Sequence, residues 1–209
     1  MVNEFFFHGV QLGLWKIGKK PLSGFRLRAS PDPFCLDGIS KSRKPRRPTP
    51  EPRYNVAVPV VIREYQPEDF ESLWRMDQEC FPPGISYSRQ ELRSFMRHRG
   101  SFTLLALNEK QELQGFIIAH CGTGGGHVIT IDVGPGTRRS GVGSVLLRSA
   151  EERMREAGCR AVGLETAVDN TGALAFYKRQ GYHVVRTWPR YYANGVDALV
   201  LKKDLNGAA

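Results

Sequence analysis

The chain has 209 residues, of which 41% are hydrophobic and 24% charged, an ordinary balance for a globular protein with a substantial core. No stretch approaches the ~20 apolar residues of a membrane-spanning helix, so we expect no membrane-embedded part. The net charge of +9 is concentrated in residues 1–60, which hold 11 basic and 4 acidic side chains, against 19 and 17 in residues 61–209. This distribution argues against nucleic-acid binding outside the first segment.

Residues 1–55 have the composition of a disordered extension. Residues 41–53 contain six basic side chains and four prolines, which suit neither a helix nor a strand ladder. We therefore predict a basic, proline-rich extension at 1–55 and a folded domain at 56–209. The extension could bind an acidic surface such as RNA, be simply solvated, or come from an overlong gene prediction, and the sequence leaves these alternatives open.

The predicted elements then follow in chain order. Their local signals are helix caps, proline and glycine stops, and runs of β-branched or apolar residues. Strands are expected at 58–63, 102–107, 113–121, 127–133, 161–165, 183–188 and 196–202, helices at 67–81, 88–97, 141–157 and 170–180, and a flexible glycine loop at 122–126.

This order predicts an α/β fold with a mixed β-sheet of about seven strands and about four helices. Strand–helix–strand segments make the strands at 127–133 and 161–165 a parallel central pair, and the flanking hairpins add antiparallel strands. Ligands of such sheets collect at the carboxyl ends of the parallel strands. A glycine-bearing turn stands at one of these ends, and Glu165 stands at the next.

The turn lies within Ile129–Ser144, which reads ITIDVGPGTRRSGVGS. A helix start exposes unpaired N–H groups and a positive dipole end, and Gly141 and Gly143 allow close approach, so we interpret the turn as a pyrophosphate cradle. A Walker loop is rejected because Val142 stands where its lysine must be, and the third glycine of a dinucleotide-binding fingerprint is missing. An ordinary strand-to-helix turn remains an alternative.

Two further side chains could carry chemistry. Glu165 ends an apolar run, and a carboxylate beside a bound ligand can act as a general base, although a solvated residue at a strand end is the alternative. Tyr177 lies on the next helix, where a packing aromatic is the alternative. The five histidines, at positions 8, 98, 120, 127 and 183, are read as core or surface residues.

The cysteines support no metal or disulfide assignment. They stand at positions 35, 80, 121 and 159, form no CxxC pair, and have no clustered histidines beside them. We expect buried free thiols at Cys80, Cys121 and Cys159, no bound metal, and a reducing, cytoplasmic location.

The motifs together resemble the GNAT superfamily of N-acetyltransferases. The resemblance covers about residues 61–205 and rests on an R-x-x-G-x-G turn, a glutamate in the next strand, and Asn-x₆-Tyr-x₃-Gly-Tyr. Within this superfamily, the sequence is similar to the ribosomal-protein-alanine (RimI-type) branch. The similar segments are Leu164-Glu165, Asn170, Ala175-Phe176-Tyr177, Gly181-Tyr182, Pro189-Arg190-Tyr191-Tyr192 and the run Asp197–Leu201.

The resemblance implies an acetyl-CoA-dependent enzyme without a metal. It implies that Glu165 is the general base and Tyr177 the general acid that protonates the CoA thiolate. The implied cofactor-binding residues are Ile131, Asp132 and Val133 for the pantetheine arm, Arg138, Arg139, Ser140, Gly141, Val142, Gly143 and Ser144 for the pyrophosphate, and Asn170. Tyr87, Tyr191 and Tyr192 are candidate walls of the acceptor pocket, or simply packing aromatics.

Several positions depart from the branch pattern. Thr166 and Ala167 follow the glutamate in place of Val-Arg, Gly134 and Thr137 alter the turn, and Asp132 puts a charge in the central strand. The sequence therefore predicts acetyl transfer to a protein N-terminal α-amine, with a ribosomal-protein alanine as one candidate acceptor. A lysine or small-molecule amine acceptor is the enzyme alternative, and an acyl-CoA-binding or RNA-associated module is the non-enzyme alternative.

Overall fold

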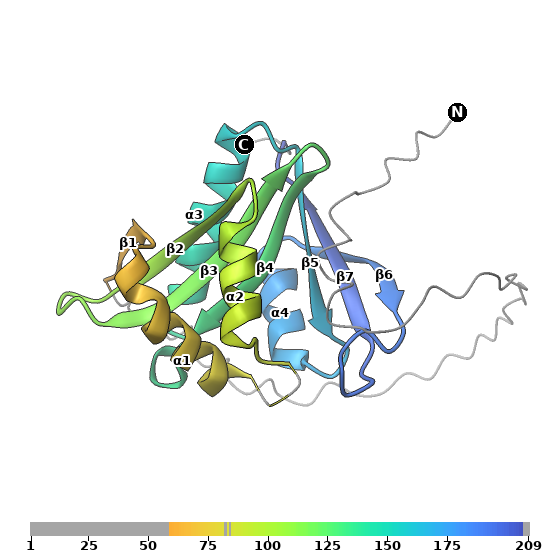
Figure 1. Cartoon of the computed structure of the whole chain (residues 1–209). Helices are drawn as coiled ribbons and strands as arrows, with labels where there is room; N and C mark the ends of the chain where they lie inside the picture. Colours follow the sequence, from red (N-terminus) through yellow and green to blue (C-terminus); the bar gives the residue numbers. More distant parts are fainter. Residues whose placement is uncertain (1–58, 82, 84, 207–209) are drawn as a thin grey trace, which may run out of the picture. The chain divides into compact units, whose positions relative to one another are not determined.

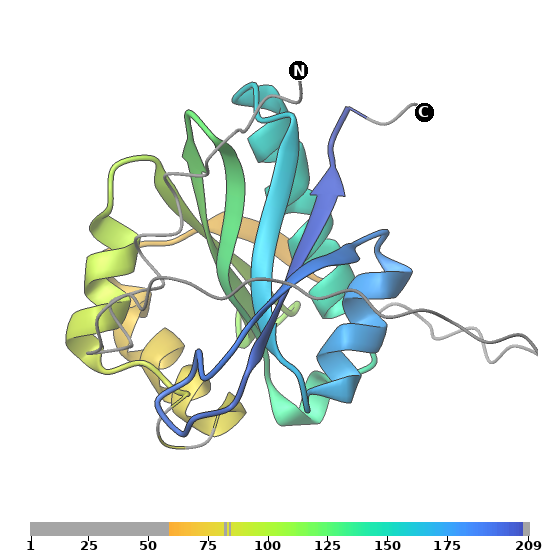
Figure 2. The same ribbon diagram turned by 90° about the vertical axis from the view of Figure 1, so that its right-hand side faces the viewer.

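In the computed structural model, a seven-stranded sheet lies between two pairs of helices (Figure 1; Figure 2). The structure describes residues 59–81, 83 and 85–206, so the predicted extension at 1–55 lies outside the described residues. The strand order is β1-β2-β3-β4-β5-β7-β6. The mixed sheet, its parallel central pair and its four helices confirm the predicted fold class.

The elements have the following bounds. The strands are β1 Val61–Glu64, β2 Ser101–Leu107, β3 Leu113–Gly122, β4 Gly125–Val133, β5 Ala161–Ala167, β6 His183–Trp188 and β7 Ala198–Asp204. The α-helices are α1 Phe70–Cys80, α2 Arg89–Arg97, α3 Val142–Glu156 and α4 Thr171–Arg179, and short 3-10 turns are η3 Pro67–Asp69 and η4 Pro135–Thr137.

The helices begin where their capping signals stand. Ser88 and Glu91 form a reciprocal capping box at the start of α2, in which the Glu91 N–H donates to Ser88 Oγ and the Ser88 N–H donates to the Glu91 carboxylate. Asn170 caps α4 by accepting the Ala173 N–H at 3.0 Å. Gly158 follows α3 with φ of +83°, a left-handed conformation that costs glycine little.

Each face of the sheet is covered by one pair of helices. In β3, Phe116 and Ile118 face α1 and α2, whereas Ile117 and Ala119 face α3, as the two-residue period of a strand requires. Figure 2 shows α1 and α2 on one side of the sheet and α3 and α4 on the other. The fully buried side chains of α3 are Val142, Leu146, Leu147, Ala150 and Met154.

Four predicted boundaries are corrected. The expected flexible loop at 122–126 is a tight hairpin, because β3 continues to Gly122 and β4 begins at Gly125. The first strand is shorter than 58–63 and begins at Val61. β5 continues two residues beyond Glu165, because antiparallel pairing with β7 extends to Ala167, and β7 itself is displaced by two residues from the predicted 196–202.

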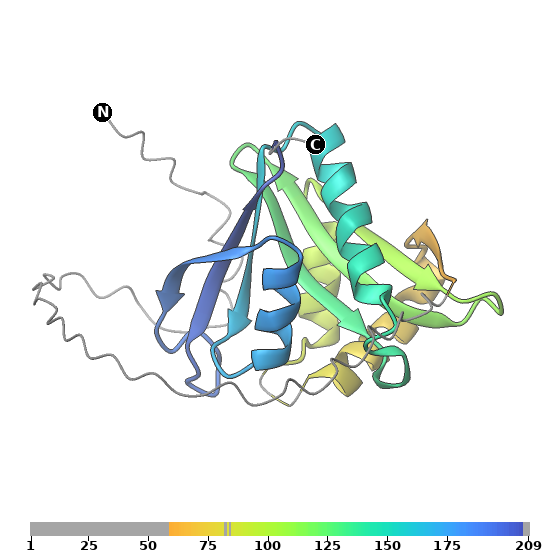
Figure 3. The same cartoon turned by 180° about the vertical axis from the view of Figure 1, so that it is seen from behind.

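The parallel pairing between β4 and β5 is confined to one end of the two strands. Gly126 pairs with Val162 and His127 with Gly163, and no later pair forms, whereas β5 pairs with β7 along its whole length. Figure 3 shows β4 and β5 diverging towards their carboxyl ends, next to α4. The rest of β4 therefore has a free edge in the middle of the sheet. Among the described helices, none is both long and apolar enough to cross a bilayer.

Candidate active site

Beyond His127 the strands β4 and β5 diverge and no longer pair (Figure 3), and we call this unzipped stretch, bordered by the β4 backbone, the slot. Ile131, Asp132 and Val133 lie in this open half, beyond the last pair with β5. A free strand edge can accept an extended, amide-bearing chain as an additional strand. The Val133 carbonyl accepts hydrogen bonds from the Cys80 thiol at 3.4 Å and from Arg138 Nε at 3.3 Å, which fix the end of the slot.

The glycine turn leads from β4 into α3 at the mouth of this slot. Arg139 and Gly141 have φ of +66° and +94°, so the chain turns sharply before Val142 begins the helix. A Cβ on Gly141 would meet no heavy atom within 4 Å, so the glycine serves the backbone conformation and leaves open space at the helix start. This geometry fits an anion bound by the first-turn N–H groups of a 15-residue helix.

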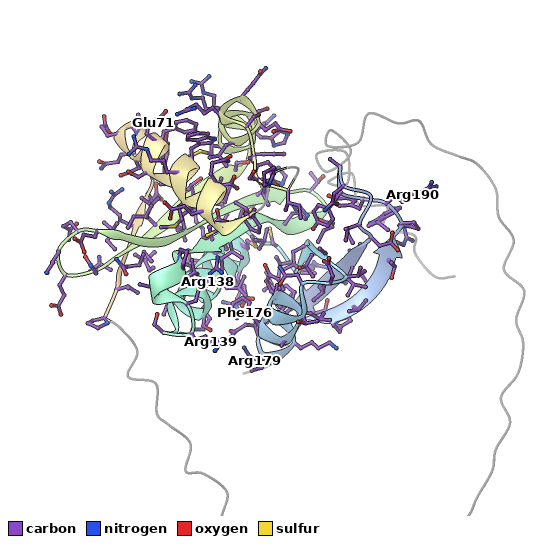
Figure 4. The ribbon with its side chains drawn as sticks, turned by 90° about the horizontal axis from the view of Figure 1, so that it is seen from below. Glu71, Arg138, Arg139, Phe176, Arg179 and Arg190 are labelled. Atoms are coloured by element: carbon purple, nitrogen blue, oxygen red, sulfur yellow. The ribbon has the colours of Figure 1, made fainter. Side chains whose placement is uncertain are left out.

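The start of α3 is held against α4. Gln180 Nε2 donates to Ser144 Oγ at 2.9 Å, and a Cβ on Gly143 would lie 3.5 Å from the Phe176 ring. Figure 4 shows Arg138 and Arg139 beside α3, with Phe176 and Arg179 on the adjacent α4. Arg179 was not among the predicted site residues; its position in the last turn of α4 is the only signal that the sequence offers.

Glu165 points into the site from within β5 rather than from its end. Its side chain is 16% exposed, and its Oε2 lies 2.8 Å from His127 Nε2 on β4. Burial alone would lower the pKa of His127, but the charge of the Glu165 carboxylate and its hydrogen bond raise that pKa overall. Sequence reasoning missed His127 as a functional residue, because only the strand register places Gly163, and hence Glu165, beside it.

Tyr177 approaches the slot from the opposite side of the sheet. It is buried on α4, in the cluster that contains Leu164, whereas Glu165 points to the other face by strand alternation. Burial, the negative charge of Asp132 and the Tyr192 hydroxyl raise the pKa of Tyr177. The phenol therefore stays protonated at neutral pH and is able to donate a proton.

Asp132 is a buried carboxylate on the α1/α2 face of β4, and its charge acts on this phenol across the sheet. It is 1% exposed, and the Thr130 hydroxyl donates to its Oδ1 at 2.7 Å. Burial and the Asp132 charge also raise the pKa of Cys80, so this thiol stays protonated. The unusual charge in the central strand thus keeps neighbouring O–H and S–H groups in their neutral forms.

Two of the predicted acceptor-site tyrosines, Tyr191 and Tyr192, interact electrostatically with Glu165, and the third, Tyr87, interacts with these two. Burial and then the Glu165 carboxylate raise the pKa of both Tyr191 and Tyr192, whose rings make an edge contact at 5.1 Å. Burial and these two tyrosines in turn raise the pKa of Tyr87. These interactions therefore link Tyr87, just before α2, to the two tyrosines between β6 and β7.

The first of these loops is attached at Tyr87. The backbone N–H of Tyr87 donates to the buried Asp77 carboxylate at 2.7 Å. The backbone carbonyl of Tyr87 accepts from Trp74 Nε1 at 3.2 Å and from Gln78 Nε2 at 2.8 Å. Its hydroxyl donates to the carbonyl of Ile129 in β4 at 3.4 Å. The loop position is therefore coupled to the central strand.

Other predicted residues lie elsewhere or serve two purposes. The Asn170 side-chain oxygen caps α4, so the group it can offer a ligand is its amide nitrogen. His183 lies on the exposed strand β6, and His8 lies outside the described residues. Among the side chains that the structure describes, no group of three or more His, Cys, Asp or Glu could hold a metal ion.

Comparison with known proteins agrees with this geometry. Residues 70–182 match the acetyltransferase (GNAT) family. The chain belongs to the GNAT acetyltransferase family. Its enzyme class is that of an N-acetyltransferase, in agreement with the sequence prediction.

Two relatives and one solved structure illustrate the similarity of this GNAT protein. The N-alpha-acetyltransferase MAK3 of Arabidopsis thaliana is 35% identical over 131 residues, which cover 61% of this chain and 67% of the relative. The uncharacterized N-acetyltransferase MJ1530 of Methanocaldococcus jannaschii is 27% identical over 146 residues, covering 69% and 91%. The ribosomal-protein-S18-alanine N-acetyltransferase of Escherichia coli has the same fold, with a TM-score of 0.64 at 19% identity over 72% of this chain and 96% of that one.

Proposed function

We propose that this enzyme transfers the acetyl group of acetyl-CoA to the N-terminal α-amine of a protein. The observation that carries the proposal is the Glu165–His127 pair, which faces the open β4–β5 slot, with the protonated Tyr177 phenol on the other side of the sheet. The 35% identity to an N-alpha-acetyltransferase supports the choice of acceptor. The cytoplasm remains the predicted location.

Glu165 is suited to remove a proton from the acceptor. A peptide α-ammonium has a pKa of about 7.7–8.0 against about 10.4 for a lysine side chain, so a carboxylate near neutral pH deprotonates it at lower cost. The carboxylate takes that proton directly or through one water, and the hydrogen bond to His127 holds it in place. The neutral amine then attacks the thioester carbonyl.

Tyr177 and the β4 backbone are suited to the second half of the reaction. As the carbon–sulfur bond breaks, the phenol donates its proton to the departing thiolate and recovers one from the former amine. Backbone N–H groups on the free edge of β4 stabilise the oxyanion of the tetrahedral intermediate. Neither role requires a side chain from outside the described residues.

The slot and the turn are suited to acetyl-CoA. Ile131, Asp132 and Val133 supply the free edge for the pantetheine arm. The residues proposed to hold the pyrophosphate and the adjoining arm are Arg138, Arg139, Ser140, Gly141, Val142, Gly143, Ser144 and Asn170.

Gly141→Val should abolish acetyl-CoA binding, measured by isothermal titration, because a branched side chain favours neither the left-handed conformation nor close approach of a phosphate. Unchanged binding would refute the cradle.

The loops that carry Tyr87, Tyr191 and Tyr192 are proposed to form the acceptor pocket. Tyr191 and Tyr192 interact electrostatically with Glu165, and Tyr87 with these two, so an N-terminal residue that reaches Glu165 would pass near them. A ribosomal-protein alanine is one candidate acceptor. The Thr166-Ala167 departure lies at the end of β5, beside this pocket, and alters the branch's substrate-side pattern.

The decisive assay measures CoA thiol release from acetyl-CoA with two peptide sets. One set has a free N-terminal Ala, Ser or Met and no lysine, and the other has a blocked N-terminus and an internal lysine. Mass spectrometry locates the acetyl group. Modification of free N-termini alone is expected. Transfer to lysine alone would replace the proposed acceptor, and acetyl-CoA binding without any transfer would favour a binding module. Repeating the assay after deletion of residues 1–55 tests whether the extension contributes.

A further inference from the structure

Acetyl transfer to an ammonium group requires one proton to leave the active site in each turnover. The ammonium carries three protons, of which one stays on the new amide and one goes to the CoA thiolate. The third, removed when the nitrogen–carbon bond forms and the carbon–sulfur bond breaks, must reach solvent. In the proposed function this proton is first taken up by Glu165, and the following inference rests on that role.

We propose that His127, His120 and His98 form the path by which this proton travels from Glu165 to the protein surface. The three histidines come from β4, from β3 and from the end of α2, and they lie on the face of the sheet that carries Glu165. The path leaves the site on the side away from the cofactor turn.

The first step is the hydrogen bond between Glu165 and His127. The two side chains are only 16% and 23% exposed, and a bound acceptor would cover them further. In the neutral form of His127 whose Nε2 carries no proton, this nitrogen lies 2.8 Å from Glu165 Oε2 and accepts the proton of protonated Glu165. An imidazole that gains a proton at one ring nitrogen can release a proton from the other, so His127 passes the charge on without turning.

The second step runs across the β3–β4 ladder. His120 is the direct antiparallel partner of His127, so the two side chains project from the same face. Directly opposed side chains of antiparallel strands have Cβ atoms about 4.5–5.5 Å apart. In the proposed path the proton passes between these two neighbouring imidazoles directly or through one water.

The third step reaches solvent. The rings of His120 and His98 have centroids 4.9 Å apart, and His98 is the exposed residue that follows α2. His120 is also held by a hydrogen bond to the Arg99 backbone, which fixes its ring between the other two histidines.

The electrostatics suit a transient carrier. Burial, followed by the neighbouring charges of His98 and His127, lowers the pKa of His120, so this ring is neutral at physiological pH and ready to accept a proton. The charged partner of His127 is Glu165 on β5, against which Tyr191 and Tyr192 of the β6–β7 loop interact, and at the outer end His98 shares a surface pocket with Arg93 and Arg97 of α2. These two tyrosines are neutral at that pH because their own pKa values are raised.

The test uses the full chain and the peptide that serves as acceptor in the thiol-release assay. His120→Gln keeps an N–H for the Arg99 carbonyl but cannot carry a proton. At pH 6.5 and saturating substrates we expect kcat to fall roughly tenfold, with the acetyl-CoA dissociation constant unchanged. The loss should disappear near pH 9, where the amine arrives neutral and no proton has to leave. Added imidazole should restore kcat at pH 6.5.

A second variant and a control keep the test independent of folding. His98→Ala changes an exposed residue and should show a smaller loss with the same pH dependence and the same response to imidazole. His183→Gln, on the exposed strand β6, should behave as the unchanged protein. A loss of equal size at all pH values, or no recovery with imidazole, would overturn the path.

The two proposals fail differently. If Glu165→Gln retains full activity, the general-base role itself is wrong. If Glu165→Gln is slow while His120→Gln and His98→Ala are both unaffected, the base stands and the proton leaves by another route.

Discussion

Glu151 and Glu165 are two covered carboxylates with opposite surroundings. Glu151 on α3 is 3% exposed and accepts hydrogen bonds from the Tyr182 hydroxyl at 2.9 Å and from Lys203 Nζ at 2.6 Å. Its partners join α3 to the turn before β6 and to β7. Glu165 borders the slot, and among the described residues the hydrogen bond to its carboxylate comes from a single titratable partner, His127.

The comparison separates a structural carboxylate from one able to exchange protons. A buried carboxylate whose two oxygens accept hydrogen bonds from side chains of other elements holds those elements together. A carboxylate whose hydrogen-bond partner is a histidine has a neighbour able to exchange protons near neutral pH. We therefore expect substitutions around Glu151 to affect stability and substitutions around Glu165 to affect turnover.

The largest effect is expected for Glu165→Gln. The amide cannot accept the ammonium proton, so kcat should fall by about 10²–10⁴ at pH 6.5 and much less at pH 9, where the amine is already neutral. Thiol release across this pH range measures the effect, and calorimetric titration should show unchanged acetyl-CoA affinity. A comparable loss of affinity would contradict the general-base role.

Lys203→Met should mainly reduce stability. It leaves the Glu151 carboxylate buried against only the Tyr182 hydroxyl, which should lower the free energy of unfolding by about 3 kcal/mol while kcat changes little. Urea denaturation of both proteins measures the difference. The matched control is Lys202→Met, which removes a more exposed lysine paired with Asp204 and should cost well under about 1 kcal/mol. Equal losses in the two variants would remove the distinction.

Tyr177, the proposed proton donor, and Tyr182, a partner of Glu151, allow a third test. Their rings lie 5.7 Å apart and both are buried, so the two Phe substitutions differ mainly in the hydroxyl removed. Tyr182→Phe removes the hydrogen bond that the Tyr182 hydroxyl donates to Glu151. The free energy of unfolding should fall by about 1.5–3 kcal/mol, with little change in kcat. Tyr177→Phe should slow transfer with little change in stability. Reversed effects would overturn both assignments.

The smallest effect is expected for the stability of His127→Gln. Because the folded-state pKa of His127 is raised, the charged pair with Glu165 stabilises the protein fully below the unfolded-state value of about 6.5 and less as pH rises through the folded-state value. The variant should thus be less stable by on the order of 1 kcal/mol at pH 6 and nearly equal to the unchanged protein at pH 9. Thermal unfolding at both pH values provides the measurement, and a constant difference would argue against an ion pair.

Helix boundaries and the fold class could be predicted because their signals are local. Ser88 and Glu91 form the predicted capping box, and Asn170 caps α4 as expected. The predicted length of β5 was wrong, since Thr166 and Ala167 become strand only through pairing with β7, which lies more than thirty residues further along the chain. Likewise, the glycine run at 122–126 predicts a loop, whereas pairing between β3 and β4 extends the strands into it.

The candidate site was predictable only where a motif is contiguous. The turn from Arg138 to Ser144 could be located from the sequence because adjacent glycines and a helix start define it. His127 could not, because its contact with Glu165 depends on the register between β4 and β5, and one residue of slip would point the two side chains apart. The buried position of Asp132 likewise depends on packing between α1 and the sheet.

The β3–β4 ladder contains one extra residue on the β4 side. Ile118 pairs with Thr130 but Ala119 pairs with Val128, so Ile129 is an extra residue that bulges from β4. The bulge lets His127 and Asp132 share a face of the sheet, although five positions separate them. An in-frame deletion of the Ile129 codon would leave His127 and Asp132 four positions apart in a regular ladder, so they would still share a face. What the deletion would remove is the bend and the extra local twist that a bulge gives its strand, two residues beyond the last β4–β5 pair at His127.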